Sequence, residues 1–195
     1  MANLSAVRYA VANYLTQPAV RLLTRTSITP STITWCGFSL AVGAGALIIT
    51  GHLFAAGFLV LLAGFFDILD GALARYTNRT TRFGAVLDSI LDRLAEAVLL
   101  LAILVLLARD QSVAPILLVG VALLSSLLVS YIRARAEALG LQCQVGLFTR
   151  AERVIVLALG LWLNQLVIAL AIIVVFSFIT VGQRLVYVWQ QTKIN

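Results

Sequence analysis

The sequence predicts an all-α integral membrane protein: six transmembrane helices preceded by an N-terminal interfacial amphipathic helix. Composition is the first indication, because 62% of the 195 residues are hydrophobic and 11% are charged, against about 45–50% and about 25% in soluble domains. The second indication is a series of six apolar segments separated by short polar connections. With only two cysteines, this composition excludes a soluble domain, a disordered chain and a disulfide-stabilised scaffold.

The N-terminal residues 1–27 form the predicted interfacial helix. Its apolar stripe, at helical spacing, consists of Leu4, Val7, Val11 and Tyr14. Pro18 is expected to kink this helix. We expect the helix to lie on the cytoplasmic leaflet rather than to cross the membrane, and a frayed N-terminal arm is the alternative.

The six transmembrane helices form a predicted bundle over residues 31–190. A hydrocarbon core of about 30 Å requires roughly 20 helical residues, and only the fifth segment is clearly shorter. Thr29-Pro30-Ser31 is a helix-start signal for the first span. The predicted spans are residues 31–50, 53–75, 83–108, 113–134, 149–163 and 166–189. Because no linker or repeat divides the chain, we expect a single membrane domain over residues 1–195.

The distribution of positive charge predicts the orientation. Most basic residues precede the first span, follow the second or fourth span, or lie near the C-terminus; they are Arg8, Arg21, Arg25, Arg75, Arg79, Arg82, Arg133, Arg135, Arg150, Arg153, Arg184 and Lys193. The connections on the other side carry Arg109 as their only fixed positive charge. The positive-inside rule therefore places both termini and the loops at 76–82 and 135–148 in the cytoplasm. We expect a multi-pass protein of the cytoplasmic membrane, surrounded by membrane lipids, with no nucleic-acid partner.

Four of the eight acidic residues lie in a 26-residue stretch that runs from the last part of the second predicted span into the third; they are Asp67, Asp70, Asp88 and Asp92. An ionised Asp at the centre of a membrane helix costs about 2.5–3.5 kcal/mol on insertion scales. Cations or water must therefore offset this cluster. Pairing of each Asp with a neighbouring Arg is a purely structural alternative.

Helical spacing gathers these carboxylates on two faces that can meet. One face of the second span carries Asp67, Asp70, Gly71, Ala74 and Arg75, and one face of the third carries Gly84, Asp88 and Asp92. Oxygen ligands without His or Cys favour Mg²⁺ or Mn²⁺. Such a centre suits phosphoryl transfer. The small residues leave room for a phosphate-bearing ligand, although small residues are also typical of close helix packing.

Residues 67–92 read DILDGALARYTNRTTRFGAVLDSILD. This segment matches the pattern DxxDGxxARx8Gx3Dx3D of the CDP-alcohol phosphatidyltransferases at every fixed position, so the chain resembles that family. The resemblance implies six transmembrane helices behind an interfacial helix, and a homodimer. It also implies a transferase that uses two Mg²⁺ or Mn²⁺ ions.

The resemblance also implies roles for individual residues. Asp67, Asp70 and Asp88 are implied to coordinate metal ions, and Asp92 is implied to be the general base, able to contact metal as well. The residues implied to bind the CDP part of a lipid such as CDP-diacylglycerol are Pro30, Ser31, Thr32, Ile33, Gly71, Arg75 and Thr81, to which we add the small residues Ala74 and Gly84. In the implied reaction an alcohol hydroxyl attacks the lipid-side phosphorus, CMP leaves, and Asp92 takes the hydroxyl proton.

The acceptor alcohol is predicted from arginines near the cytoplasmic ends of the fourth and fifth spans. The segment RARAE at 133–137 resembles the corresponding segment of prokaryotic phosphatidylinositol phosphate synthases. In those enzymes the residues matching Arg133, Arg135 and Arg153 bind the inositol phosphate group. Guanidinium groups suit phosphate, although positive-inside anchoring explains the same charges equally well. Arg184 or Lys193 is the candidate for a further basic residue of those enzymes.

The sequence therefore predicts phosphatidyl transfer from CDP-diacylglycerol, or a related CDP-lipid, to inositol 1-phosphate. Glycerol 3-phosphate, the acceptor of phosphatidylglycerol phosphate synthases, is the alternative. A small channel or transporter is an alternative of another class. It is less consistent with the sequence, because polar groups would then be expected near the midplane of several spans.

Overall fold

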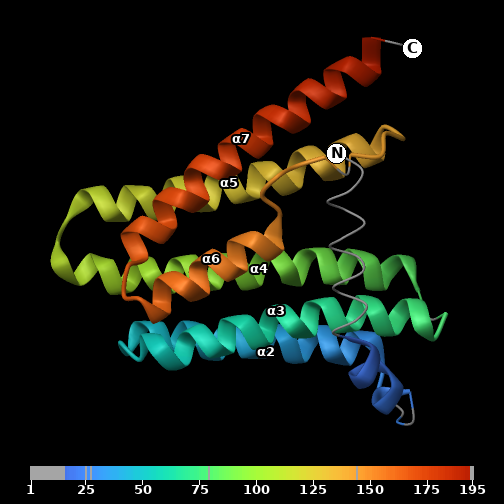
Figure 1. The fold of residues 1–195 in the computed structure, drawn as a ribbon, viewed down its shortest axis with the longest axis horizontal. Helices are drawn as coiled ribbons and strands as arrows, with labels where there is room; N and C mark the ends of the chain where they lie inside the picture. The colour runs from blue at the N-terminus through green and yellow to red at the C-terminus, as the bar shows by residue number, and fades with distance from the viewer. Residues whose placement is uncertain (1–15, 25, 27, 79, 144, 194–195) are drawn as a thin grey trace.

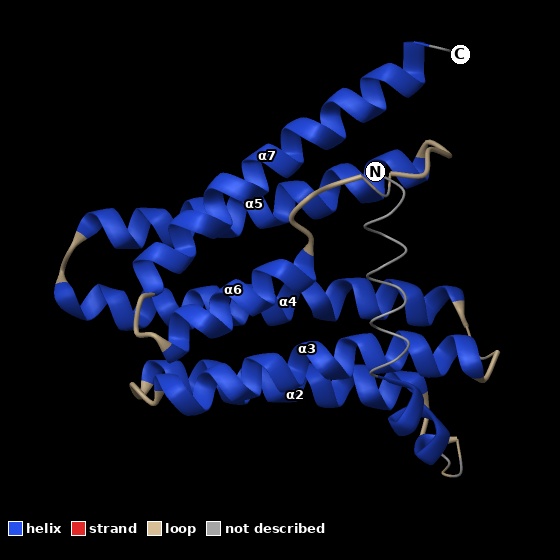
Figure 2. Cartoon of the chain, viewed as in Figure 1, coloured by secondary structure: helices blue, strands red, loops and turns tan. Residues whose placement is uncertain are grey.

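The computed structural model describes residues 16–24, 26, 28–78, 80–143 and 145–193. Within these residues the chain forms helices and no strand (Figure 2). The long helices are α2 (Pro30–Ile49), α3 (Leu53–Tyr76), α4 (Arg82–Leu107), α5 (Val113–Ala138), α6 (Arg150–Trp162) and α7 (Leu166–Lys193), with a 3₁₀ turn, η1, at Ala108–Asp110. Each predicted span overlaps one of these helices.

The helix ends follow local signals in most places. Thr29 caps α2 by accepting a hydrogen bond from the Thr32 amide at 3.3 Å, as the helix-start signal predicts. The prediction that a loop begins at residue 135 is wrong, because α5 continues to Ala138. Arg135 therefore lies on the last turns of a helix and not in a loop. The extension follows from Arg133, Ala134, Arg135 and Ala136, which are good helix formers.

The helices form a closed ring around a shared core. Contacts run from α2 to α3, α6, α7, α5, α4 and back to α2, so helices distant in sequence become neighbours. Successive helices run in opposite directions (Figure 1). The α3–α4 connection, the α5–α6 connection and the end of α7 consequently lie toward the same end of the bundle (Figure 1).

Side-chain burial matches a membrane environment. Buried apolar residues from several helices, including Ile48, Val60, Ile103 and Leu170, form one cluster. Large apolar side chains such as Leu101, Leu117 and Phe176 are exposed on the outside of the same helices. An outer surface of this kind is suited to lipid rather than to water.

Four helices, α2, α3, α5 and α7, are long and apolar enough to cross a membrane. The helix α6 has only 13 residues, and α4 carries Asp88, Asp92, Arg93 and Glu96 in its first half. The protein is therefore a multi-pass membrane protein. Six spans with cytoplasmic termini remain a prediction.

The predicted interfacial helix falls mainly on residues 1–15, which lie outside the described residues. Residues 16–23 are helical. In this stretch Val20 is buried against Ile33 of α2 and against Leu69 and Leu73 of α3. This helical stretch is thereby packed against the part of α3 that carries the aspartates.

Candidate active site

A cluster of carboxylates lies where α3 faces α4. Asp67 on α3 and Asp88 and Asp92 on α4 each offer a carboxylate oxygen, and these oxygens lie within 4.8 Å of one another. Asp70 lies one turn after Asp67 on α3 and is outside this group of three. The two carboxylate-bearing faces predicted from helical spacing therefore do meet.

Two oxygens of these carboxylates are buried without a hydrogen-bond partner in the described part of the chain. Asp70 Oδ2 and Asp88 Oδ1 have no hydrogen-bond partner among the described residues. An isolated buried carboxylate oxygen is costly in a medium of low polarity. Oxygens without partners, converging with those of Asp67 and Asp92, fit the donor set of a hard divalent cation.

Arg150, which the sequence places among the arginines near the cytoplasmic ends of the fourth and fifth spans, contacts the carboxylates directly, a contact that the sequence does not predict. It is the first residue of α6, and its guanidinium forms ion pairs with Asp67 and, at 2.8 Å, with Asp92 Oδ1. A cation at a helix N-terminus opposes the helix dipole, so these carboxylates must stabilise its placement. Thr149 and Glu152 form a capping box that begins α6 at this point.

An open cavity of about 540 Å³ adjoins the carboxylates on the side of α2 and the α3–α4 connection. It is lined by Thr29, Pro30, Ser31, Thr34, Asp70, Gly71, Ala74, Arg75, Asn78, Thr80, Thr81, Gly84, Ala85 and Asp88. Most residues predicted to bind the CDP-lipid therefore line one cavity. We call it the donor cavity.

Two of the predicted CDP-lipid residues do not line the donor cavity. Ile33 is buried in the cluster around Val20 and Leu69, and the Thr32 hydroxyl lies 2.9 Å from that of Thr29. Thr34, Asn78 and Thr80 line the cavity although sequence reasoning did not select them. Thr34 lies one turn into α2, so the helical period is the signal that identifies it.

The cap at the start of α4 explains why residue 84 is a glycine. The Gly84 amide donates a 2.9 Å hydrogen bond to the Thr81 hydroxyl, which caps the helix. A Cβ atom at residue 84 would stand 2.8 Å from that hydroxyl oxygen. Glycine therefore permits both the cap and an unobstructed wall of the donor cavity.

A second cavity, of about 210 Å³, lies on the other side of the carboxylates. It is lined by Asp67, Asp92, Arg93, Glu96, Val129, Ser130, Arg133, Thr149, Arg150, Arg153 and Arg184. We call it the acceptor cavity. Asp67 and Asp92 line it, whereas Asp70 and Asp88 line the donor cavity.

The structure distinguishes among the basic residues considered from the sequence. Arg133, Arg153 and Arg184 line the acceptor cavity. Arg135 is exposed on α5 and does not line it. Lys193 instead stacks on Trp189, with 3.9 Å from Nζ to the ring centroid.

Arg184 is held by the backbone that surrounds it. Its Nε donates a 2.9 Å hydrogen bond to the Val145 carbonyl, and its Nη1 donates to the Val129 carbonyl. Neighbouring α7 side chains also bind the α5–α6 connection: Gln183 accepts from the Leu147 amide and Tyr187 donates to the Gln142 carbonyl, both at 3.1 Å. These contacts, distant in sequence, place a basic residue of the last helix in the cavity.

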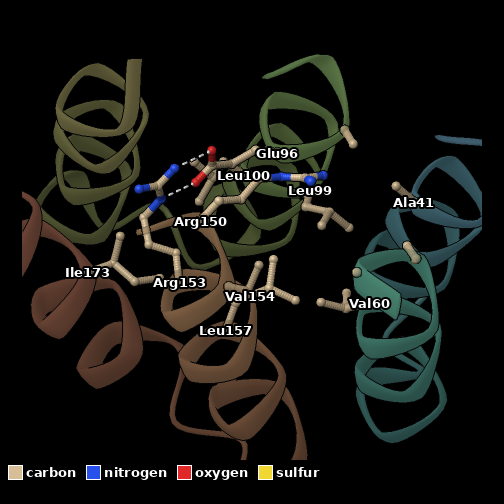
Figure 3. Close-up of a pocket in the computed structure, with 13 residues that line it drawn as sticks. Ala41, Val60, Glu96, Leu99, Leu100, Arg150, Arg153, Val154, Leu157 and Ile173 are labelled. Carbon is tan, nitrogen blue, oxygen red and sulfur yellow. Dashed lines mark hydrogen bonds and ion pairs between the residues drawn. The ribbon is translucent and has the colours of Figure 1, made fainter. Parts of the chain in front are cut away.

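A small, mainly apolar cavity of about 30 Å³ lies among residues deeper in α3, α4 and α6 (Figure 3). Its walls include Val60, Leu99, Leu100 and Leu157, with Arg150 and Arg153 at one side. The charged side chains thus adjoin an apolar layer.

The chain is similar to proteins of one known family. Residues 27–186 match the CDP-alcohol phosphatidyltransferase family. An archaetidylinositol phosphate synthase of Methanothermobacter thermautotrophicus is 39% identical over 167 residues, which is 83% of each chain. A phosphatidylinositol phosphate synthase of Mycobacterium tuberculosis is 36% identical over 200 residues, covering 97% of this chain and 92% of the relative.

Solved structures of the Mycobacterium tuberculosis phosphatidylinositol phosphate synthase have a similar fold. The crystal structure with CDP-DAG bound superimposes with a TM-score of 0.80 at 35% identity, covering 90% of this chain and 94% of that one. The structure in complex with manganese and citrate gives a TM-score of 0.79 at 35% identity, covering 89% and 88% of the two chains. Together with the carboxylate cluster, the manganese complex indicates the use of a divalent metal.

Replacement of Asp88 should weaken metal binding. Because Asp88→Asn removes one converging carboxylate charge, we expect Mn²⁺ affinity to fall by more than about tenfold, the loss that even an outer-shell partner can produce. Electron paramagnetic resonance of free Mn²⁺ measures this affinity. Glu137→Gln is the control, because Glu137 is half-exposed on α5 and pairs with Arg133. Equal affinity in wild type and Asp88→Asn would contradict the assignment.

Proposed function

The chain belongs to the CDP-alcohol phosphatidyltransferase family, and from that premise we propose that it transfers the phosphatidyl group of a CDP-linked lipid to inositol 1-phosphate, releasing CMP. One observation carries this proposal: the carboxylates stand between a donor cavity and an arginine-lined acceptor cavity. Relatives named for synthesis of phosphatidylinositol phosphate or archaetidylinositol phosphate support the choice of acceptor.

The donor cavity suits a pyrophosphate. The first turns of α2 and α4 both border it, through Pro30 and Ser31 and through Thr81 and Gly84. The positive ends of the two helix dipoles attract phosphate oxygens. Arg75 adds a cation to the same wall, and the small side chains of α3 let a bulky headgroup approach the backbone.

The carboxylates would hold divalent metal, with Asp67, Asp70 and Asp88 as ligands and Asp92 able to contribute. When bound, the metal neutralises phosphate oxygens and stabilises the leaving CMP. We propose Mg²⁺ or Mn²⁺ as the metal, with two ions bound, on the family resemblance and the number of carboxylates.

The chemical step follows from the position of Asp92 on the acceptor side. An acceptor hydroxyl beside Asp92 gives up its proton to the carboxylate as its oxygen attacks the phosphorus that carries the lipid. The phosphoanhydride bond breaks, and CMP leaves on the donor side. Arg150, paired with Asp67 and Asp92, offsets negative charge between the two cavities.

The acceptor cavity suits a phosphorylated alcohol. Arg133, Arg153 and Arg184 bring guanidinium groups from α5, α6 and α7 to one space. Guanidinium groups form strong, directional hydrogen bonds with phosphate. A phosphate anchored there leaves the hydroxyl-bearing part of the molecule free to approach Asp92. Arg135 is exposed on α5 and outside the lining of this cavity, so we propose no contact between it and the acceptor phosphate.

We further propose that residues 1–195 act as one membrane domain with six spans, cytoplasmic termini and an active site that faces the cytoplasm. The charge distribution supports this orientation. Assembly as a homodimer is proposed on the family resemblance.

The acceptor is tested with purified protein, CDP-diacylglycerol and Mg²⁺, following both CMP and the lipid product. We expect turnover with inositol 1-phosphate, little with free inositol or serine because neither carries the phosphate, and none after metal removal with EDTA. Turnover with glycerol 3-phosphate alone would overturn the acceptor but keep the chemistry. Absence of metal-dependent CMP release with any acceptor would overturn the proposed function.

Asp92→Asn should abolish most turnover while preserving the donor site. Loss of a general base costs about 10²–10⁴-fold in rate, so we expect CMP release to fall by that factor. Binding of CDP-diacylglycerol, measured by equilibrium dialysis, should change little because Asp92 does not line the donor cavity. Undiminished CMP release would exclude Asp92 as the base.

Arg184→Gln and Lys193→Gln form a matched pair. The first removes a cation from the acceptor cavity, and loss of a charged hydrogen bond of about 1.5–3 kcal/mol corresponds to a rise in KM for inositol 1-phosphate of about 10- to 150-fold. The second removes a cation that stacks on Trp189, so the KM should stay near the wild-type value. Equal effects of the two substitutions would contradict the assignment of Arg184.

A further inference from the structure

Glu96 lines the acceptor cavity, yet the mechanism assigns it no role. It follows Asp92 by four residues on α4, so the two side chains share a face one turn apart. Its carboxylate accepts hydrogen bonds from Arg153 Nε at 2.6 Å and from Arg153 Nη2 at 3.0 Å. It also accepts one from the Ser126 hydroxyl on α5. Three helices thus meet at one carboxylate.

This contact fixes the plane of the Arg153 guanidinium. Two parallel hydrogen bonds to one carboxylate define both the direction and the rotation of the group. Arg153 is also buried, with 3% of its side chain exposed, which limits other rotamers. Figure 3 shows the third guanidinium nitrogen pointing away from Glu96. That nitrogen, Nη1, is buried and has no hydrogen-bond partner among the described residues.

A need for positive charge in the acceptor cavity does not explain why Arg153 is paired with Glu96. An acid next to Arg153 weakens the attraction of that cation for phosphate, so an acceptor site built only for positive charge would omit Glu96. A long arginine side chain, however, has several rotamers, and ordering it costs conformational entropy. A carboxylate that orients the guanidinium in advance lowers that cost when a ligand binds.

We propose that Glu96, itself held by Ser126, is a positioning residue that presents Arg153 to the phosphate of the acceptor. The inference rests on the proposed function, because it deepens the assignment of the acceptor cavity. Glu96 and Ser126 act through Arg153, and neither needs to contact the substrate. The competing explanation is that the ion pair only ties α4, α5 and α6 together.

Glu96→Asp separates the two explanations, because it keeps the charge but shortens the side chain by one methylene. We expect the KM for inositol 1-phosphate to rise about tenfold, equivalent to about 1.4 kcal/mol. The KM for CDP-diacylglycerol, kcat and the thermal midpoint should stay near wild type. If the ion pair only holds the helices together, Glu96→Asp should instead lower the thermal midpoint and change the KM for both substrates.

Ser126→Ala is the second variant and Ser125→Ala its matched control. Ser126→Ala leaves the Glu96–Arg153 pair in place but removes the hydrogen bond from Ser126 to Glu96. We therefore expect a smaller rise in the KM for inositol 1-phosphate than with Glu96→Asp. Ser125 is equally buried, but its hydroxyl donates to the Ala122 carbonyl on its own helix at 3.0 Å. Ser125→Ala should therefore match wild type. Identical behaviour of the two serine variants would count against the inference.

Calorimetric titration of inositol 1-phosphate into the metal-loaded protein, without CDP-lipid, tests the inference independently of turnover. Weaker binding to Glu96→Asp supports it, and unchanged binding together with an unchanged KM overturns it. Failure of the proposed function has a different signature, since wild type would then release no CMP with any acceptor. If glycerol 3-phosphate alone supports turnover, the same comparisons apply to that phosphate.

Discussion

Negative charge gathered at one end of an apolar bundle is the constraint on which the rest of the site depends. Asp67, Asp88 and Asp92 bring oxygens within 4.8 Å of one another, where water alone would solvate them poorly. Such a cluster must be balanced by cations. Arg150 supplies one from the start of α6, and the buried oxygens of Asp70 and Asp88 fit a divalent ion.

The ring of helices places this carboxylate cluster between the donor cavity and the acceptor cavity. Since α3 contributes to the walls of both cavities, as does α4, each helix can present one carboxylate to the donor side and another to the acceptor side. A nucleotide-linked lipid and a soluble phosphate would therefore approach the same charges from different directions. Such an arrangement suits an in-line displacement, in which the attacking and leaving oxygens lie on opposite sides of the phosphorus.

The arginines fall into two groups according to what holds them. Arg150 and Arg153, at the start of α6, are held by carboxylates, whereas Arg184 is held by backbone carbonyls of other segments. A carboxylate partner reduces the net positive charge around an arginine, but it fixes the orientation of the guanidinium strongly. Carbonyl partners leave the full charge in place. Together they give an acceptor cavity that is both cationic and ordered.

The sequence by itself determined the helices and the carboxylate motif, because both rest on short-range information: apolar run length, the helical period, caps such as Thr29, and the spacing from Asp67 to Asp92. That motif also identified the family. Tertiary structure decided which distant residues join the motif. Arg184, rather than Lys193, lines the cavity because α7 packs against the α5–α6 connection. Glu96 meets partners 30 and 57 residues away, a pairing that only the packing of α4, α5 and α6 can create.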